Sequence, residues 1–253
     1  MITIDLNSDV GESFGRYQLG NDAGLFPYIT SANIACGFHA GDPLVMQRTV
    51  HLALENGTAI GAHPGYPDIQ GFGRRQMDLT AEELEVMVLY QVSALAGVTR
   101  ASGGELIHVK PHGAMYNHAA KDIQAARAIA RGVARFSKSL ILVGLAGSAL
   151  IEAGIDSGLR VANEGFPERQ YNTDGTLMSR KQPGSTLTEE RLVAEQAVRL
   201  VKEGIKFQGG KIQAVVCVDT LCIHGDNPAA IVLTKAIRQK LADEGIGINR
   251  LGM

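Results

Sequence analysis

The chain has 253 residues, of which 45% are hydrophobic and 20% charged, and its formal net charge is -2. No basic stretch carries interleaved aromatic residues, so we expect neither nucleic acid nor a membrane surface as a partner, and a small molecule fits better. The start of the chain lacks a signal-peptide pattern, and no apolar run reaches the roughly 18 residues that a transmembrane helix needs. We therefore expect a soluble, cytoplasmic protein. Three cysteines without Cys-x-x-Cys spacing predict reduced thiols.

Short apolar segments alternate with helical patterns along the chain. Seven strands are predicted, at residues 2–6, 32–36, 58–62, 106–110, 140–144, 160–163 and 214–218. Most are apolar on both faces, which is typical of parallel strands covered by helices on both sides. Because no linker or repeat divides the chain, we predict one domain over residues 1–253, a closed or nearly closed seven-stranded, TIM-barrel-like (β/α) barrel. A doubly wound open sheet is the alternative, since periodicity does not report closure.

The helices between these strands have clear start signals. Asp42-Pro43 opens one that ends at Gly57, residues 80–83 form a capping box, and Asn227-Pro228 opens the last helix. Two segments, residues 64–76 and 164–186, show no periodicity. Long loops of this kind are usually functional or disordered, and each carries arginine, so we expect two functional lids.

The first predicted strand carries polar residues at its odd positions. Asn7 and Asp9 share one face, and Glu12 follows directly. A carboxylate that faces the inside of a barrel is costly unless it is paired or bound to a cation. Asp9 and Glu12 are therefore candidate site residues, whereas Asp5 serves equally well as a brace of the barrel.

The fourth predicted strand ends in a second polar group. His108, Lys110 and His112 alternate along residues 106–112 and lie on one face, and Pro111 and Gly113 end the strand. Ligands of α/β proteins bind at the carboxyl ends of such strands. His39, His63 and His224 also come after the carboxyl ends of predicted strands, each after a different one. Asp219 follows the last of these strands directly. In a barrel these groups converge on one mouth.

Such a cluster is suited to proton transfer near neutral pH. Lys110 and a lid arginine, Arg74 or Arg169, could hold a carboxylate or an oxyanion. Alternatively, Asp9, His39 and His63 could bind a divalent metal, Mg or Zn, that activates water. A nucleophilic Cys36 with His39 as its base is a further interpretation, against which stands simple packing of small residues in an Ala-Cys-Gly turn. No P-loop is complete, so the residues themselves do not predict ATP binding.

Five blocks, residues 5–12 (DLNSDVGE), 31–42 (SANIACGFHAGD), 61–68 (GAHPGYPD), 109–116 (VKPHGAMY) and 222–226 (CIHGD), resemble the LamB/YcsF family in order and over nearly the whole chain. The resemblance implies a barrel of the glycoside hydrolase/deacetylase type. It also implies ATP-dependent hydrolytic opening of the lactam 5-oxo-L-proline (pyroglutamate) to L-glutamate, with ATP as co-substrate and with 5-oxoprolinase subunits B and C as partners. Whether this chain or a partner binds ATP is left open.

We accordingly assign catalysis and substrate binding as hypotheses. The catalytic set is Asp9, His39, His63, Lys110 and His112, and the substrate-binding set is Asn7, Glu12, Arg74, Arg169, Asp219 and His224. Two rival functions remain: a metal-dependent deacetylase or amidohydrolase that acts on a small amide without ATP, and a non-catalytic binding protein that only presents substrate to its partners.

Overall fold

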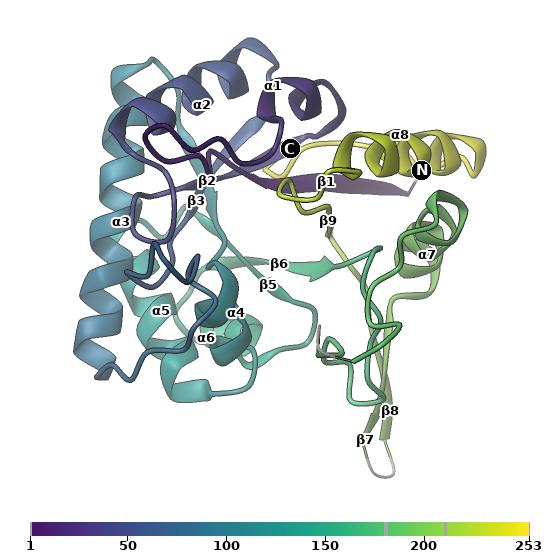
Figure 1. The fold of residues 1–253 in the computed structure, drawn as a ribbon. Coiled ribbons are helices and arrows are strands. Elements are labelled where there is room, and N and C mark those ends of the chain that lie inside the picture. Colours follow the sequence, from purple (N-terminus) through teal and green to yellow (C-terminus); the bar gives the residue numbers. More distant parts are fainter. Residues whose placement is uncertain (1, 180–181, 210–211, 253) are drawn as a thin grey trace.

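The computed structural model describes residues 2–179, 182–209 and 212–252 (Figure 1). Its centre is a parallel sheet in the order β1-β2-β3-β4-β5-β6-β9, which closes because β9 also pairs with β1. The strands are β1 (Thr3–Val10), β2 (Ser31–Ala35), β3 (Ala59–His63), β4 (Leu106–Val109), β5 (Ile141–Leu145), β6 (Arg160–Gly165) and β9 (Thr220–Cys222). The predicted seven-stranded (β/α) barrel is confirmed, and the open-sheet alternative is wrong.

The seventh strand was predicted in the wrong place. The apolar run at residues 214–218 enters β8 (Ile212–Val216), which pairs antiparallel with β7 (Ile205–Gly209). This hairpin extends away from the barrel, as Figure 1 shows. The barrel instead closes through β9, where Thr220 is paired with Asp5 of β1 and with Glu164 of β6. A short strand, β10 (Gly247–Ile248), pairs with the start of β1.

Helices surround the barrel (Figure 1). They are α1 (Asp22–Leu25), the 3-10 helix η1 (Phe26–Tyr28), α2 (Pro43–Glu55), α3 (Ala81–Ala101), α4 (Gly113–Ala119), α5 (Ile123–Phe136), α6 (Ala149–Asp156), α7 (Glu190–Glu203) and α8 (Ala230–Asp243). Asp42 caps α2 by accepting from two backbone N–H groups, and Thr80 and Glu83 form the predicted capping box of α3. The last helix begins at Ala230, two residues after the expected Pro228. Within the described part of the chain, none of the helices has the length and apolarity that crossing a bilayer requires.

The two faces of β1 show why the fold can place polar groups at its centre. Ile4 and Leu6 are buried in the apolar layer between sheet and helices, whereas Asp5, Asn7 and Asp9 alternate with them. The inside of the barrel is therefore polar, and its groups bond to one another across strands, as Asn33 of β2 does with Asn7 and Asp9. These bonds offset the cost of burying polar side chains.

Asp5 makes the stability of the barrel depend on pH. Its carboxylate accepts hydrogen bonds from the hydroxyls of Thr30, Ser31 and Thr220, yet burial raises its pKa from 3.8 to about 6. The folded protein thus holds this proton more tightly than the unfolded chain, so this contribution to stability is present at low pH and is lost as the pH rises through 6. We therefore compare the free energy of unfolding of wild type with that of Asp5→Asn. The wild-type value minus the variant value should fall by about 2 kcal/mol between pH 4 and pH 7. Urea unfolding at several pH values measures this difference, and a pH-independent difference would contradict it.

Gly61 in β3 is required because of a close approach inside the barrel. A Cβ atom at this position would lie 2.0 Å from Nε2 of His108, whose ring donates to Oδ1 of Asn33 at 2.7 Å. We expect Gly61→Ala to lower the free energy of unfolding by about 1–3 kcal/mol, because the overlap forces the ring or the strand to move. Gly97→Ala is the matched control: this glycine is exposed in α3 with no atom near the added Cβ, and the change should raise stability by about 0.5–1 kcal/mol. If the two variants unfolded at the same urea concentration, the expected overlap with His108 would be contradicted.

Candidate active site at the carboxyl ends of the strands

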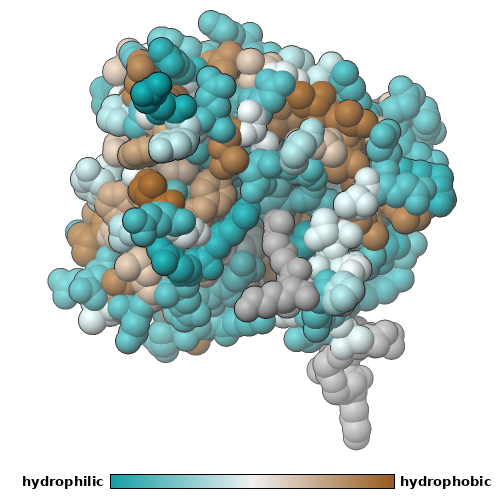
Figure 2. Space-filling view, in the orientation of Figure 1, coloured by the Kyte–Doolittle hydropathy of each residue, from teal (hydrophilic) through white to brown (hydrophobic). Residues whose placement is uncertain are grey.

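A cavity of about 660 Å³ opens at the carboxyl ends of the barrel strands. Eight of the predicted site residues line it: Asp9, Glu12, His63, Arg74, Lys110, His112, Arg169 and His224. They come from the ends of β1, β3, β4 and β9 and from the two long loops after β3 and β6, as the barrel geometry requires. In the surface view of Figure 2, hydrophilic side chains predominate on the face that this figure presents.

Lys110 lies at the floor of the cavity and makes four polar contacts. Its Nζ is 2.7 Å from Oε1 of Glu164, 2.9 Å from Oδ1 of Asp9, 3.2 Å from Oδ1 of Asn7 and 3.0 Å from Sγ of Cys222. Burial alone would lower the pKa of Lys110, but the adjacent Asp9 and Glu164 outweigh it and hold this pKa well above its ordinary value. Lys110 is therefore a fixed cation and not a proton acceptor.

Asp9 connects this cation to the histidines. Its Oδ1 accepts from Lys110 and from Nδ2 of Asn33 at 2.8 Å, and its Oδ2 is 3.3 Å from Nε2 of His63. Burial tends to raise the pKa of Asp9, but the charges of His63 and Lys110 and the bond to His63 hold it well below the ordinary value. Asp9 thus remains a carboxylate at the edge of the cavity.

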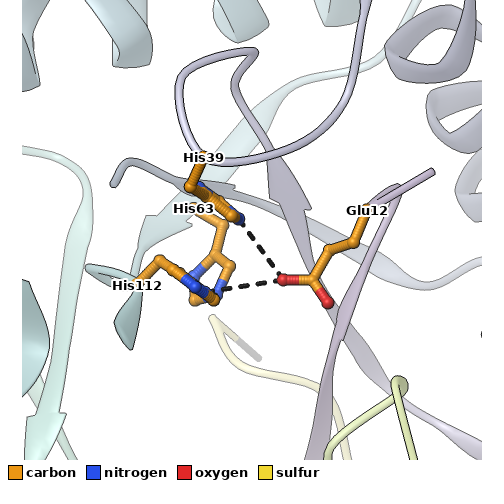
Figure 3. A group of neighbouring side chains, drawn as sticks. All are labelled: Glu12, His39, His63 and His112. Carbon is orange, nitrogen blue, oxygen red and sulfur yellow. Dashed lines mark hydrogen bonds and ion pairs between the residues drawn. The ribbon is translucent and has the colours of Figure 1, made fainter. Parts of the chain in front are cut away.

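Three imidazoles and one carboxylate form a compact cluster beside Asp9. Figure 3 shows the side chains of Glu12, His39, His63 and His112 pointing toward one another from four separate segments. His39 and His112 stack with ring centroids 3.7 Å apart, and Oε1 of Glu12 is 3.3 Å from Nε2 of His39. One ligand atom of each residue lies within 4.8 Å of the others, so this group could hold a metal ion. Asp9, which we had grouped with His39 and His63 as a metal set, contacts only His63 of these four.

Burial controls the protonation of this cluster. It lowers the pKa of His39 well below the ordinary value and that of His112 to about 3, with neighbouring histidine charges adding to the effect. For Glu12, burial and then the charge of Asp9 raise the pKa well above its ordinary value. Without a bound cation, His39 and His112 are neutral near pH 7.

The loop between β3 and α3 packs directly on these rings. A Cβ atom at Gly65 would lie 2.6 Å from Nδ1 of His39, and one at Gly73 would lie 2.7 Å from Cβ of His39 and 2.9 Å from Cδ2 of His112. Phe72 has a positive φ of 53°, which is strained for a bulky residue, and its carbonyl accepts from Nε2 of His112 at 2.8 Å. The loop therefore fixes the two rings in place.

The second long loop and the end of β9 form the opposite wall. Phe166 stacks on His224 with centroids 5.6 Å apart, and Nδ1 of His224 bonds to Glu168. Arg169 donates from Nη2 to the carbonyl of Met178 at 2.6 Å. At the mouth, Nη2 of Arg74 is 2.7 Å from Oδ2 of Asp226. The cavity therefore combines apolar surface with charged groups of both signs, which suits a small polar molecule.

Three predicted site residues do not line the cavity. Asn7 is buried and bonds to Lys110, Glu164 and Thr220, and His39 is buried and contacts Glu12. Asp219 is exposed at the start of β9, the end opposite the cavity, where its Oδ2 accepts from the N–H of Asn163 at 2.7 Å. The assignment of Asn7 and Asp219 to substrate binding stays a prediction that these positions do not favour, because a parallel strand brings only its carboxyl end to the mouth.

The surroundings of Cys36 do not favour the alternative interpretation in which it is a nucleophile. Its Sγ donates to the carbonyl of Ile34 at 3.3 Å, and burial raises its pKa to about 12, so it stays a thiol. Cys36 and Cys222 are buried and Cys217 is exposed, and all three are free. The prediction of reduced thiols is confirmed.

Two residues of the site were missed in the sequence. Glu164, the second carboxylate on Lys110, lies in β6, which runs two residues beyond the predicted strand. Glu164 is two residues after Ala162 and therefore shares its face of the strand, and this spacing was the signal available. Tyr116 lines the cavity from α4 and packs its ring edge on Phe166, but in the sequence it resembles one more apolar position of a short helix.

Comparison with known proteins gives a consistent result. Residues 4–253 match the LamB/YcsF family. A Pyrococcus furiosus protein, named as the A subunit of 5-oxoprolinase, is 52% identical over 250 residues, which cover 98% of each chain. One of the same name from Limosilactobacillus fermentum is 53% identical over 249 residues, 98% of this chain and 99% of that one.

Solved structures agree with the sequence relationships. The crystal structure of a lactam utilization protein from Thermus thermophilus superposes with a TM-score of 0.91 at 45% identity, covering 99% of this chain and 100% of that one. A putative cellobiose-phosphate cleavage protein from Enterococcus faecalis V583 superposes at 0.62 with 12% identity over 98% and 97% of the two chains, which shows a shared fold alone. The agreement of profile, sequence and structure over almost every residue shows that this chain belongs to the LamB/YcsF family.

Proposed function

We propose that this chain catalyses the hydrolytic opening of 5-oxo-L-proline to L-glutamate, in an ATP-dependent reaction carried out with 5-oxoprolinase subunits B and C. The observation that supports it most strongly is the pairing of a fixed cation, Lys110, with carboxylates and imidazoles at the floor of a cavity in a chain about 50% identical to proteins named as the A subunit of 5-oxoprolinase. The word subunit in those names supports a multi-chain enzyme.

The chemistry requires an activated lactam, because an amide carbonyl is a poor electrophile. In the proposed sequence, the lactam oxygen takes the terminal phosphoryl group of ATP and ADP leaves. Water adds to the ring carbon, the carbon–nitrogen bond breaks and the nitrogen takes a proton. A second water then releases phosphate from the resulting acyl phosphate. The sum consumes one ATP and two waters and gives glutamate, ADP and phosphate.

The residues around the cavity supply the groups that this sequence needs. Asp9, His63 and His112 are the candidates for taking a proton from water and delivering one to the ring nitrogen, since they line the cavity and contact one another. Lys110 and the arginines Arg74 and Arg169 neutralise the carboxylate or the phosphoryl group. None of the described residues that line the cavity belongs to a phosphate-binding P-loop, so a separate experiment must show which chain binds ATP.

The decisive assay measures glutamate release from 5-oxoproline, with and without ATP and with and without subunits B and C. We expect release only when all components are present, and release by the partners without this chain would overturn the proposal. Binding of an ATP analogue to the isolated chain and to the partners identifies the chain that holds ATP.

The Glu12–His39–His63–His112 cluster favours a second candidate, a metal-dependent amidohydrolase or deacetylase that acts on a small amide without ATP. Turnover of 5-oxoproline that needs ATP and survives a chelator would exclude it. Turnover of a small amide that needs metal and not ATP would favour it over the lactam reaction.

A further inference from the structure

The tautomers of His63 and His112 are fixed by backbone carbonyls. Nδ1 of His63 is 2.6 Å from the carbonyl oxygen of Lys110, and Nε2 of His112 is 2.8 Å from that of Phe72. A carbonyl oxygen only accepts, so each of these nitrogens carries the hydrogen. In the neutral rings the remaining nitrogens, Nε2 of His63 and Nδ1 of His112, therefore hold lone pairs. Nε2 of His63 is also 3.3 Å from Oδ2 of Asp9, a further acceptor, so a positive charge at this nitrogen is favoured from both sides.

These two lone pairs face each other. The nitrogens that carry them are 3.0 Å apart, inside a region where both residues are at most 3% exposed. Two acceptors at hydrogen-bonding distance repel each other unless a positive charge lies between them. A histidine that binds a metal typically donates its other N–H to a backbone carbonyl, which is the arrangement of both rings here.

Two more donor atoms converge on the same point. Oε1 of Glu12 is 3.5 Å from Nδ1 of His112 and 3.3 Å from Nε2 of His39. Four ligands in tetrahedral geometry at about 2.0–2.1 Å from a metal lie about 3.3–3.4 Å from one another. Three of the spacings here, 3.0, 3.3 and 3.5 Å, are close to this value, and all four ligand atoms lie within 4.8 Å of one another. The stacked rings of His39 and His112 would rotate slightly to direct both nitrogens at one ion. In Figure 3 the four side chains point into this common space.

We propose that Glu12, His39, His63 and His112 bind one divalent transition-metal ion. Three imidazole nitrogens and one carboxylate oxygen are ligands that suit zinc and its neighbours, whereas magnesium and calcium prefer oxygen alone. The ion adjoins the cavity because Glu12, His63 and His112 line it, while His39 holds the ion from behind. Gly65 and Gly73 let the loop pack directly against the rings, which keeps the ligand side chains close to one another.

The role of the ion, which would be to polarise an oxygen of the substrate or of water, rests on the proposed function. With the ion bound, the lone pairs of His63 and His112 are occupied, so Asp9 is the group left to transfer protons. Binding of the ion to this site does not depend on the proposed function. The binding experiment therefore needs no substrate, ATP or partner chain.

The test titrates ZnCl₂ into chelator-treated full-length protein by calorimetry and counts the retained metal after gel filtration. Wild type should bind one equivalent, with a rise in melting temperature, and a Co²⁺ substitute should show the strong visible bands of tetrahedral coordination. His39→Ala should weaken zinc binding by more than about 100-fold, the upper range for losing a residue that only orients a ligand. His51→Ala, an exposed histidine on α2, is the matched control and should bind as wild type does.

A second variant tests whether the other candidate group binds the metal instead, and each variant is checked for its folded spectrum. His224→Ala removes a member of the other candidate group, Asp9, Cys222 and His224, and should retain the zinc. Folded wild type that binds no zinc would overturn the proposal and leave a proton shared by His63 and His112 as the charge between them. Equal binding by His39→Ala, or loss of binding in a folded His224→Ala, would overturn it as well. Zinc binding without lactam opening would instead overturn the proposed function alone.

Discussion

Replacement of Lys110 by methionine is expected to abolish glutamate release and to lower the free energy of unfolding by about 3–5 kcal/mol. Methionine fills a similar volume, so the change removes chiefly the charge. Asp9 and Glu164 would then be left as buried carboxylates without their common cation, in a site where the lysine side chain is 3% exposed. Removing one partner of a buried ion pair costs far more than removing an exposed one.

Urea unfolding followed by circular dichroism measures the stability effect, and the reconstituted glutamate assay measures the effect on turnover. Lys138→Met is the control, since this lysine is exposed and the change should alter neither quantity by more than about 0.5 kcal/mol or its equivalent in rate. If Lys110→Met unfolded at the wild-type urea concentration, the cation would not be stabilising the barrel interior.

Replacement of His112 by alanine is expected to reduce glutamate release by about 10²–10⁴-fold while the barrel stays folded. His112 lines the cavity, contacts His63 and Glu12, and stands at the N-cap position of α4 without a side-chain capping bond. Its loss removes a proton-transfer group from the metal-free site, or one of the four ligands from the site that holds an ion. The apolar layer between sheet and helices does not include this ring, so the circular dichroism spectrum should be unchanged.

The rate is measured in the complete system with ATP and subunits B and C, beside the His51→Ala variant as control. Turnover of His112→Ala at the wild-type rate would remove this residue from the mechanism. A fall in rate accompanied by loss of the folded spectrum would mean that the ring acts through stability and would contradict the expectation.

Much of the barrel could be predicted because buried parallel strands are apolar on both faces and their helices carry strong capping signals. The failure at the seventh strand has a physical cause. Residues 214–218 are largely β-branched and apolar, as a buried strand should be. In contrast, β9 has only three residues and begins with Thr220, whose hydroxyl donates to Asp5 and accepts from Asn7. Local propensity favours the longer run, and closure of the barrel selects the shorter one.

The sequence predicts which residues lie at the mouth of the barrel but not which of them contact one another. Strand alternation and position placed Asp9, Lys110 and His112 correctly at one mouth. That Glu12 joins the three histidines, while Asp9 pairs with Lys110, depends on the turn after β1 and on the loop around Phe72. Sequence distance does not report how such irregular segments fold back over a strand end. The same limit explains Asp219, which is near a strand in sequence but at its opposite end in space.

The way β1 is paired has a consequence for biosynthesis. β1 leaves the ribosome before β2 and pairs with it early, but its other edge is completed only by β9 and β10, which follow much later in the sequence. Throughout most of translation the nascent chain therefore presents an open parallel edge with Asp5 and Asn7 beside it, still without Thr220. A chaperone that binds unpaired strands would therefore bind this edge for longest. A stalled chain that ends before residue 220 would leave the edge exposed permanently.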